Sequence, residues 1–236
     1  MIRVTQLLLA SLAATGCGPR APVEPTTPTY EGTGGSEAAE ADDGMVVAGL
    51  TGTLRRDEVD PVMNSAVSRF MRCYAEELDA LPVLSGDLSL GFTVAPDGSV
   101  AEVRTLASTL GSRATEECIL QIGRGLRFPR PHGGQANFEY GPVLFNPGEG
   151  SPTAALWDPT EVSEALAARA TEVEACGASS GVSVTLYIGP GGSVRSIGAV
   201  PESADRDEAA RCLERVLSSV TFADPGARVT KVTLEL

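Results

Sequence analysis

Apolar and polar residues recur along the chain with two different periods, and the changes between these periods predict the order of helices and strands. Between residues 59 and 78, apolar side chains return every three or four positions, which predicts an amphipathic helix. We expect Asp60 and Pro61 to begin this helix as its N-cap and first helical residue, and Pro82 to end it. Cys73 lies on the apolar face of this helix.

Four further segments follow, up to residue 145. A tight turn at Asp97 and Gly98 joins the first two of them. The segments are predicted strands at residues 86–94, 99–106 and 135–145, and a predicted helix at residues 115–125 that carries Cys118 on its apolar face.

The second half of the chain has the same order of patterns. Asp158 and Pro159 are typical of a helix start. The predicted buried stripe of this helix is Val162, Leu166, Ala170, Val173 and Cys176. Strands at residues 182–188 and 193–200, a helix at residues 205–218 with Cys212, and a last strand at residues 229–236 follow. Gly189–Ser193 lacks the lysine of a phosphate-binding loop, so we interpret it as a hairpin turn.

The two halves are related by nearly constant shifts. A shift of 94 positions places residues 88–131 on residues 182–225 without a gap, and a shift of 103 positions carries Cys73 onto Cys176. Identical residues at the first shift include Ser89/Ser183, Pro96/Pro190, Gly98/Gly192, Cys118/Cys212 and Phe128/Phe222. One α-β-β-α-β unit built twice explains both shifts.

The repeat predicts an α+β fold of two tandem modules, each a small antiparallel sheet with two helices on one face. Module one spans residues 49–147 and module two spans residues 158–236. Residues 148–157 are the predicted linker.

The positions of the cysteines predict which helices are joined by disulfides. Four of the five cysteines lie in the modules, and four cysteines allow three pairings. If both modules have one fold, the equivalent bonds are Cys73–Cys118 and Cys176–Cys212, each of which clips two helices together. Four free thiols are the alternative. We predict no metal site, because the chain has no C-x-x-C pair and a single histidine.

The first residues have the pattern of an export signal. A basic start at Arg3 precedes an apolar run, residues 7–14, that is too short to span a bilayer. Thr15-Gly16-Cys17 resembles a bacterial lipobox, which implies a signal peptide at residues 1–16 and lipidation of Cys17. An ordinary secretory signal followed by a chance cysteine is the alternative.

Charge and composition indicate how the exported chain attaches to a membrane. Residues 17–48, rich in Pro, Thr, Gly and acidic residues, are predicted to be a disordered tether. The net charge of −13 argues against nucleic acid as a partner and against electrostatic binding to anionic lipids. We therefore expect a lipid anchor that faces the periplasm. Gly18, in place of an acidic residue, favours the outer membrane.

Several stretches of the first half together resemble a known family. They are Gly49–Leu54, Cys73-Tyr74, Val94–Val100, Ser108–Gly111, Cys118 and Leu126–Gly134. This set resembles the AgmX/PglI C-terminal domain family, distant relatives of the TonB C-terminal domain found in envelope proteins of gliding bacteria. The resemblance covers residues 49–147, whereas the second copy is degenerate and has Ala223-Asp224-Pro225 in place of the Phe-Pro-x-Pro element. It implies an envelope adaptor or assembly module without catalytic residues.

Candidate binding residues are few. His132 has no paired carboxylate or nucleophile at catalytic spacing, so we predict no catalytic residues and no cofactor. The pairs Glu76-Glu77 and Glu116-Glu117 are neighbours on helices, and we expect them on solvated faces. The candidate partner-binding residues are Arg127, Arg130 and His132 in the basic loop 127–134, and Trp157 at the module junction, which either packs the modules together or anchors a partner.

These predictions favour a non-enzymatic envelope lipoprotein that binds another envelope protein. Strand addition to a free sheet edge is the expected mode, with the strands at residues 135–145 and 229–236 as candidate edges. A cell-wall or small-ligand binding lipoprotein that uses the loop 127–134 is the first alternative, and a hydrolase with an unrecognised site is the second. A deep pocket with convergent polar groups would favour the alternatives.

Overall fold

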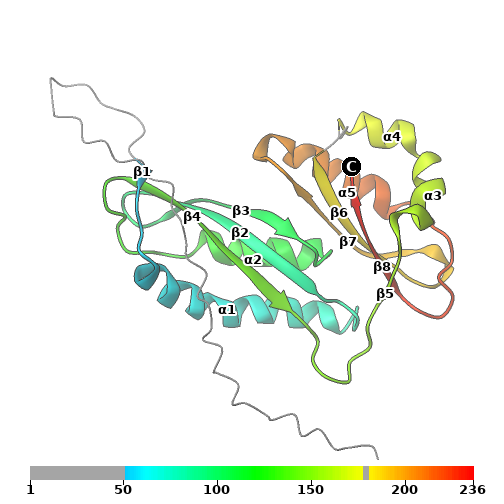
Figure 1. Cartoon of the computed structure of the whole chain (residues 1–236), viewed down its shortest axis with the longest axis horizontal. Coiled ribbons are helices and arrows are strands. Elements are labelled where there is room, and N and C mark those ends of the chain that lie inside the picture. The colour runs from blue at the N-terminus through cyan, green and yellow to red at the C-terminus, as the bar shows by residue number, and fades with distance from the viewer. Residues whose placement is uncertain (1–50, 178–180) are drawn as a thin grey trace, which may run out of the picture. The chain divides into compact units, whose positions relative to one another are not determined.

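A computed structural model describes residues 51–177 and 181–236, and all of these residues belong to one compact unit. The predicted signal peptide, Cys17 and the tether lie outside the described residues. The fold is α+β, with two mixed sheets, five α-helices and two disulfides in the described part of the chain (Figure 1).

The first sheet has the strand order β1-β4-β2-β3. Its strands are β1 (Thr51–Gly52), β2 (Gly86–Val94), β3 (Val100–Ser108) and β4 (Gln135–Phe145). β2 is antiparallel to both β3 and β4, and its alternate residues Leu88, Leu90, Phe92 and Val94 are buried. This alternation directs one face of the sheet to the core.

Helices α1 (Arg56–Leu78) and α2 (Arg113–Arg124) pack on that face. The buried stripe of α1 is Val59, Met63, Ala66, Phe70, Cys73 and Tyr74. The predicted start of α1 at Asp60–Pro61 was wrong, because the helix begins at Arg56 and includes Pro61. The physical reason is the Glu58 carboxylate, which accepts a hydrogen bond from the Arg55 backbone N–H at 2.8 Å and so caps the helix one turn earlier.

The second sheet has the order β5-β8-β6-β7, the same connectivity as the first. Its strands are β5 (Ala155–Leu156), β6 (Val182–Ile188), β7 (Val194–Pro201) and β8 (Thr230–Glu235). The hairpin turn expected before Ser193 is present as the short 3-10 turn η2 (Pro190–Gly192) between β6 and β7. A further 3-10 turn, η3 (Ala204–Arg206), leads into helix α5 (Asp207–Ser218).

The predicted strand arrangement was wrong in one respect, which is the same in both sheets. Each sheet is mixed rather than antiparallel, because β1 pairs in parallel with β4 and β5 pairs in parallel with β8. These added strands have two residues each, which is too short for alternation to show in the sequence.

The first helix predicted for the second half is broken. It consists of η1 (Pro159–Val162), α3 (Ser163–Ala167) and α4 (Ala170–Ala175), and of the predicted stripe only Val162 is fully buried. The shift of 103 places Arg169 where α1 has the fully buried Ala66. A guanidinium group cannot take that apolar place at low cost, and the helix is interrupted at Arg169.

Both disulfides join a first helical segment to a second helix. Cys73 of α1 is bonded to Cys118 of α2, and Cys176, which follows α4, is bonded to Cys212 of α5. These are the pairs that the repeat predicts. The Cα–Cα separations are 5.9 and 5.4 Å, within the usual range for disulfides.

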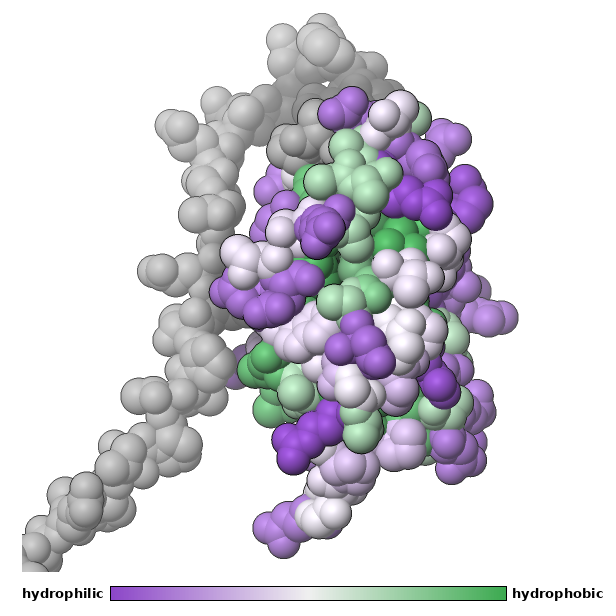
Figure 2. All heavy atoms as spheres, turned by 90° about the vertical axis from the view of Figure 1, so that its right-hand side faces the viewer, coloured by the Kyte–Doolittle hydropathy of each residue, from purple (hydrophilic) through white to green (hydrophobic). Residues whose placement is uncertain are grey.

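The surface on the side of the second sheet is mostly hydrophilic. Figure 2 shows small, separate apolar areas there among polar side chains. Among the described residues, the large apolar side chains that are strongly exposed are Leu144 on β4 and Leu156 on β5, at 71% and 81%.

Candidate functional site

The two sheets meet at a seam that is built around Tyr187 of β6. Its side chain is fully buried and belongs to the apolar core of the first sheet. The Tyr187 hydroxyl donates to the Ser85 carbonyl at 2.8 Å and accepts from the Ser85 N–H at 3.1 Å. The Lys231 ammonium of β8 also donates to the Ser85 carbonyl, at 2.7 Å. One backbone segment before β2 is thus held by two strands of the other sheet.

Two glycines allow the backbones to approach at this seam. A Cβ on Gly111 would lie 2.6 Å from Cγ2 of Thr185, and Gly111 has a φ of +67°. A Cβ on Gly198 of β7 would lie 3.0 Å from Oε1 of Glu116. Ser196 of β7 donates a hydrogen bond to the Gly111 carbonyl at 2.8 Å. A side chain at Gly111 would push the two sheets apart, whereas one at Gly198 would require the Glu116 carboxylate to shift.

An ionic cluster lies beside these glycines. Arg113, the first residue of α2, pairs with Glu214 of α5 and, at 2.6 Å, with Glu117 one turn further along α2. The other oxygen of Glu214 accepts the backbone N–H of Ala199 on β7 at 3.1 Å. Glu116 accepts a hydrogen bond from the Ser108 hydroxyl at 2.6 Å. Residues from both sheets therefore satisfy these buried carboxylates.

Burial changes the protonation of this cluster. Burial, with a smaller contribution from the nearby Glu214, raises the pKa of Glu116 to about 7, although the Ser108 hydrogen bond and Arg113 oppose the rise. Burial also raises the pKa of Glu214, against the effect of Arg113. Glu116 is therefore about half protonated near pH 7 and largely protonated near pH 6.

The burial of Glu116 contradicts the prediction for the pair Glu116-Glu117. The sequence predicted both Glu116 and Glu117 on a solvated face, but Glu116 is buried and Glu117 is exposed. β7 of the second sheet covers the Glu116 side of α2. The sequence carries no local signal for this contact, because Gly198 lies 82 positions further along the chain.

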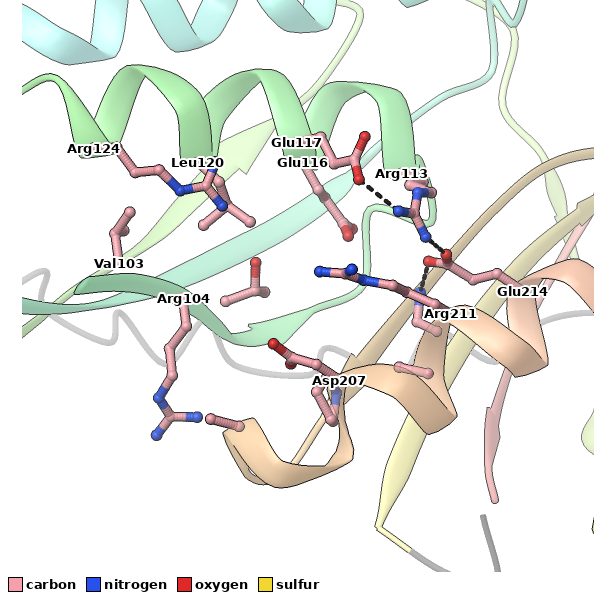
Figure 3. Close-up of a pocket in the computed structure, with 15 residues that line it drawn as sticks. Val103, Arg104, Arg113, Glu116, Glu117, Leu120, Arg124, Asp207, Arg211 and Glu214 are labelled. Atoms are coloured by element: carbon pink, nitrogen blue, oxygen red, sulfur yellow. Dashed lines mark hydrogen bonds and ion pairs between the residues drawn. The ribbon is translucent and has the colours of Figure 1, made fainter. Parts of the chain in front are cut away.

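A polar pocket opens at the cluster, between α2, β3 and α5. Its volume is about 140 Å³. Figure 3 shows the side chain of Arg211 directed from α5 toward the gap below Glu116, with Asp207 on the same helix beside the gap. The charged side chains that line the pocket are Arg104, Arg113, Arg124, Arg211, Glu116, Glu117, Glu214 and Asp207.

The predicted basic loop 127–134 lies elsewhere, beside the start of α1 and β1. The Arg127 side chain is 73% exposed and lies 3.9 Å from Asp97, a long ion pair. Arg130 is exposed. His132 bonds through its backbone to Thr53 and lies 3.3 Å from the Glu58 carboxylate. Two of the three basic residues thus have an acidic neighbour within the chain.

Trp157 is not part of this loop. It is half-buried against the core of the second sheet, and its backbone N–H donates to the Lys231 carbonyl at 2.9 Å. The structure therefore does not bring the four predicted binding residues together.

The outer edge of β4 is the second candidate surface. β1 pairs only with Gln135 and Ala136, and no other described strand pairs with this edge over the remaining residues, 137–145. Leu144 lies on this stretch. On β8 the short strand β5 similarly pairs only with Thr230 and Lys231.

Comparisons with protein-family models, with curated proteins and with solved structures found no match for this chain. In the described part of the chain, no helix has both the length and the apolar character needed to cross a bilayer. Residues 51–177 and 181–236 also contain no group of three or more His, Cys, Asp or Glu side chains placed to hold a metal ion.

Proposed function

We propose that this protein is a non-enzymatic lipoprotein of the cell envelope that binds another envelope protein by accepting a strand at the outer edge of β4. The observation that carries the proposal is that no described strand pairs with the outer edge of β4 over residues 137–145. The outward-facing backbone N–H and C=O groups of this stretch, apart from Pro142, which has no N–H, would offer hydrogen bonds to an added strand, and Leu144 would offer an apolar contact.

The pairing of β1 supports this mode of binding. β1 is already a short strand added in parallel to the first two residues of β4. A partner strand that continues beyond Gly52 would extend the same pairing along β4. The first sheet would then gain a longer fourth strand without a change in its other strands.

Two further parts of the proposal concern origin and location. The equal connectivity of the two sheets, together with the shifts of 94 and 103 positions, supports duplication of one module, and the resemblance to the AgmX/PglI C-terminal domain family supports an envelope role. The disulfides support an oxidising compartment outside the cytoplasm. Lipidation of Cys17 would then hold the protein at the membrane, facing the periplasm.

The test uses two exposed leucines as a matched pair. Leu144→Lys places a charge on the proposed edge, and Leu156→Lys makes the same change on β5. Both side chains are mostly exposed, so we expect both variants to fold. We expect a short chemical crosslinker in living cells to capture an envelope protein with the wild type and with Leu156→Lys, but not with Leu144→Lys.

Equal capture by the two variants would contradict binding at the β4 edge. Loss of capture in both would equally contradict it, because the loss would then follow from added charge rather than from position.

A further inference from the structure

The two disulfides differ in how deeply their cysteines are buried. Cys73 is 3% exposed and belongs to α1, which six buried residues hold in the first core. Its partner Cys118 is partly buried against the same core. Cys176 and Cys212 are both only partly buried. The first disulfide therefore has one cysteine enclosed in a core, whereas the second has none.

An open groove lies at the second disulfide. Its volume is about 460 Å³, and both Cys176 and Cys212 line it, together with Ala175 at the end of α4. This volume is many times the roughly 30 Å³ that one water molecule takes up in the liquid, so the groove can admit a thiol side chain. Because α3 and α4 contain no buried residue, this wall of the groove can also open locally at little cost.

The two disulfides also differ in where a released sulfur would lie. A thiolate that attacks a disulfide forms a bond to one sulfur and expels the other sulfur as a thiolate. Attack on Cys118 would expel Cys73 as an anion inside an apolar core, and attack on Cys73 would require entry into that core. At the second disulfide, either sulfur would be expelled beside the groove. Access and charge release therefore both favour reaction at the second disulfide.

We propose that Cys176–Cys212 is a thiol–disulfide exchange site, which a dithiol reduces while Cys73–Cys118 stays intact. A thiolate of the dithiol forms a mixed disulfide with one cysteine of the pair, and the other cysteine is released and takes up a proton. The second thiol of the dithiol then attacks the mixed disulfide, which yields the oxidised dithiol and a second free cysteine. Two electrons and two protons pass from the dithiol to the protein. Oxidoreductases with a C-x-x-C pair carry such a dithiol.

Reduction at this site changes how α3 and α4 are held. The disulfide ties Cys176, directly after α4, to Cys212 of α5. Without it, α3 and α4 have no buried residue to keep them in place, whereas the fully buried Val162 still holds the preceding turn η1. Oxidation docks the two helices again. The exchange site is separate from the β4 edge, so failure of either proposal leaves the other standing.

The experiment treats the full purified chain with dithiothreitol in native buffer. Free thiols are alkylated at intervals, and peptide mass spectrometry measures how fast each cysteine pair is reduced. We expect Cys176–Cys212 to be reduced about tenfold or more faster than Cys73–Cys118, because access and local opening differ. In concentrated urea the two rates should become similar. Equal rates in native buffer, or a difference that persists in urea, would overturn the proposal.

Two variants test whether the dithiol enters through the groove. Ala175→Phe places a large side chain in its lining, and Ala170→Phe makes the same change at the other end of α4, outside the lining. Both alanines are exposed, so we expect both variants to fold. Ala175→Phe should slow reduction of Cys176–Cys212 about fivefold through reduced access, and Ala170→Phe should leave the rate unchanged. Equal rates in the two variants would show that attack does not pass through the groove, which would also overturn the proposal.

Discussion

At the scale of single residues, Gly111 determines how closely the two sheets approach. Its φ of +67° favours glycine, and a Cβ there would collide with Thr185 at 2.6 Å. We expect Gly111→Ala to lower the free energy of unfolding by roughly 2–4 kcal/mol, from backbone strain and overpacking together. Chemical denaturation followed by circular dichroism measures the change.

Gly226→Ala separates these two causes. Gly226 has a φ of +76° but nothing within 4 Å of an added Cβ, so it carries only the backbone cost, about 1–2 kcal/mol. If Gly111→Ala costs no more than Gly226→Ala, the close contact with Thr185 does not exist in solution.

Glu116 gives the seam a defined pH dependence. Its pKa in the folded protein, about 7, lies above its ordinary value of 4.5, so folding favours the protonated form. The stability that this group contributes is present below pH 4.5 and is lost as the pH rises through 7. Relative to Glu116→Gln, the wild type should lose up to about 3 kcal/mol of unfolding free energy between pH 5 and pH 8.

Urea unfolding of both proteins at four pH values between 5 and 8 measures this difference. Because Glu214 is present in both, its own titration largely cancels in the comparison. A difference between the two proteins that stays constant with pH would show that Glu116 is not buried.

Prediction from sequence had a clear limit at this scale. Residue patterns along a helix correctly placed the apolar stripe of α1, because that stripe reflects contacts with its own sheet. The burial of Glu116 depends on β7, from the other half of the chain. No local pattern encodes such a contact, and the sequence therefore did not predict the residues that line the polar pocket between α2, β3 and α5.

At the scale of secondary-structure elements, α1 in the first half of the chain and α3 and α4 in the second half are held in place by different interactions. Six buried residues hold α1 in the core, whereas α3 and α4 contain no buried residue. We expect Cys176→Ala/Cys212→Ala to release α3 and α4, with rapid amide hydrogen exchange there. The matched variant Cys73→Ala/Cys118→Ala should leave α1 protected from exchange, although either variant can lose about 4 kcal/mol of stability.

Hydrogen exchange with mass spectrometry reads both helical regions in one experiment. Full protection of α3 and α4 without their disulfide would show that the disulfide does not hold these helices in place. The broken helix also shows a limit of prediction from the repeat. The shift of 103 positions places Cys176 at the position of Cys73, but it also places Arg169 at the position of the buried Ala66.

At the scale of the whole molecule, Tyr187 couples the two sheets. It is fully buried in the core of the first sheet although it belongs to β6 of the second. We expect the wild type to unfold in one transition and Tyr187→Ala to unfold in two. The substitution should also cost roughly 3–5 kcal/mol, as for other large buried side chains.

Trp157 makes this prediction measurable. It is the single tryptophan of the chain and packs on the core of the second sheet, so its fluorescence reports that sheet alone. Fluorescence and far-ultraviolet circular dichroism should give one midpoint in the wild type and separate midpoints in Tyr187→Ala. Coincident midpoints in both proteins would show that Tyr187 does not couple the sheets.

Site-specific photo-crosslinking in living cells tests whether a partner strand adds to the outer edge of β4. A photoreactive amino acid is placed at Asn137, Glu139 or Leu144 on β4, and at the exposed Ala75 of α1 as a control. We expect the β4 positions to crosslink to one envelope protein and Ala75 to form no crosslink. Crosslinks of equal strength from Ala75, or none from any β4 position, would contradict strand addition at this edge.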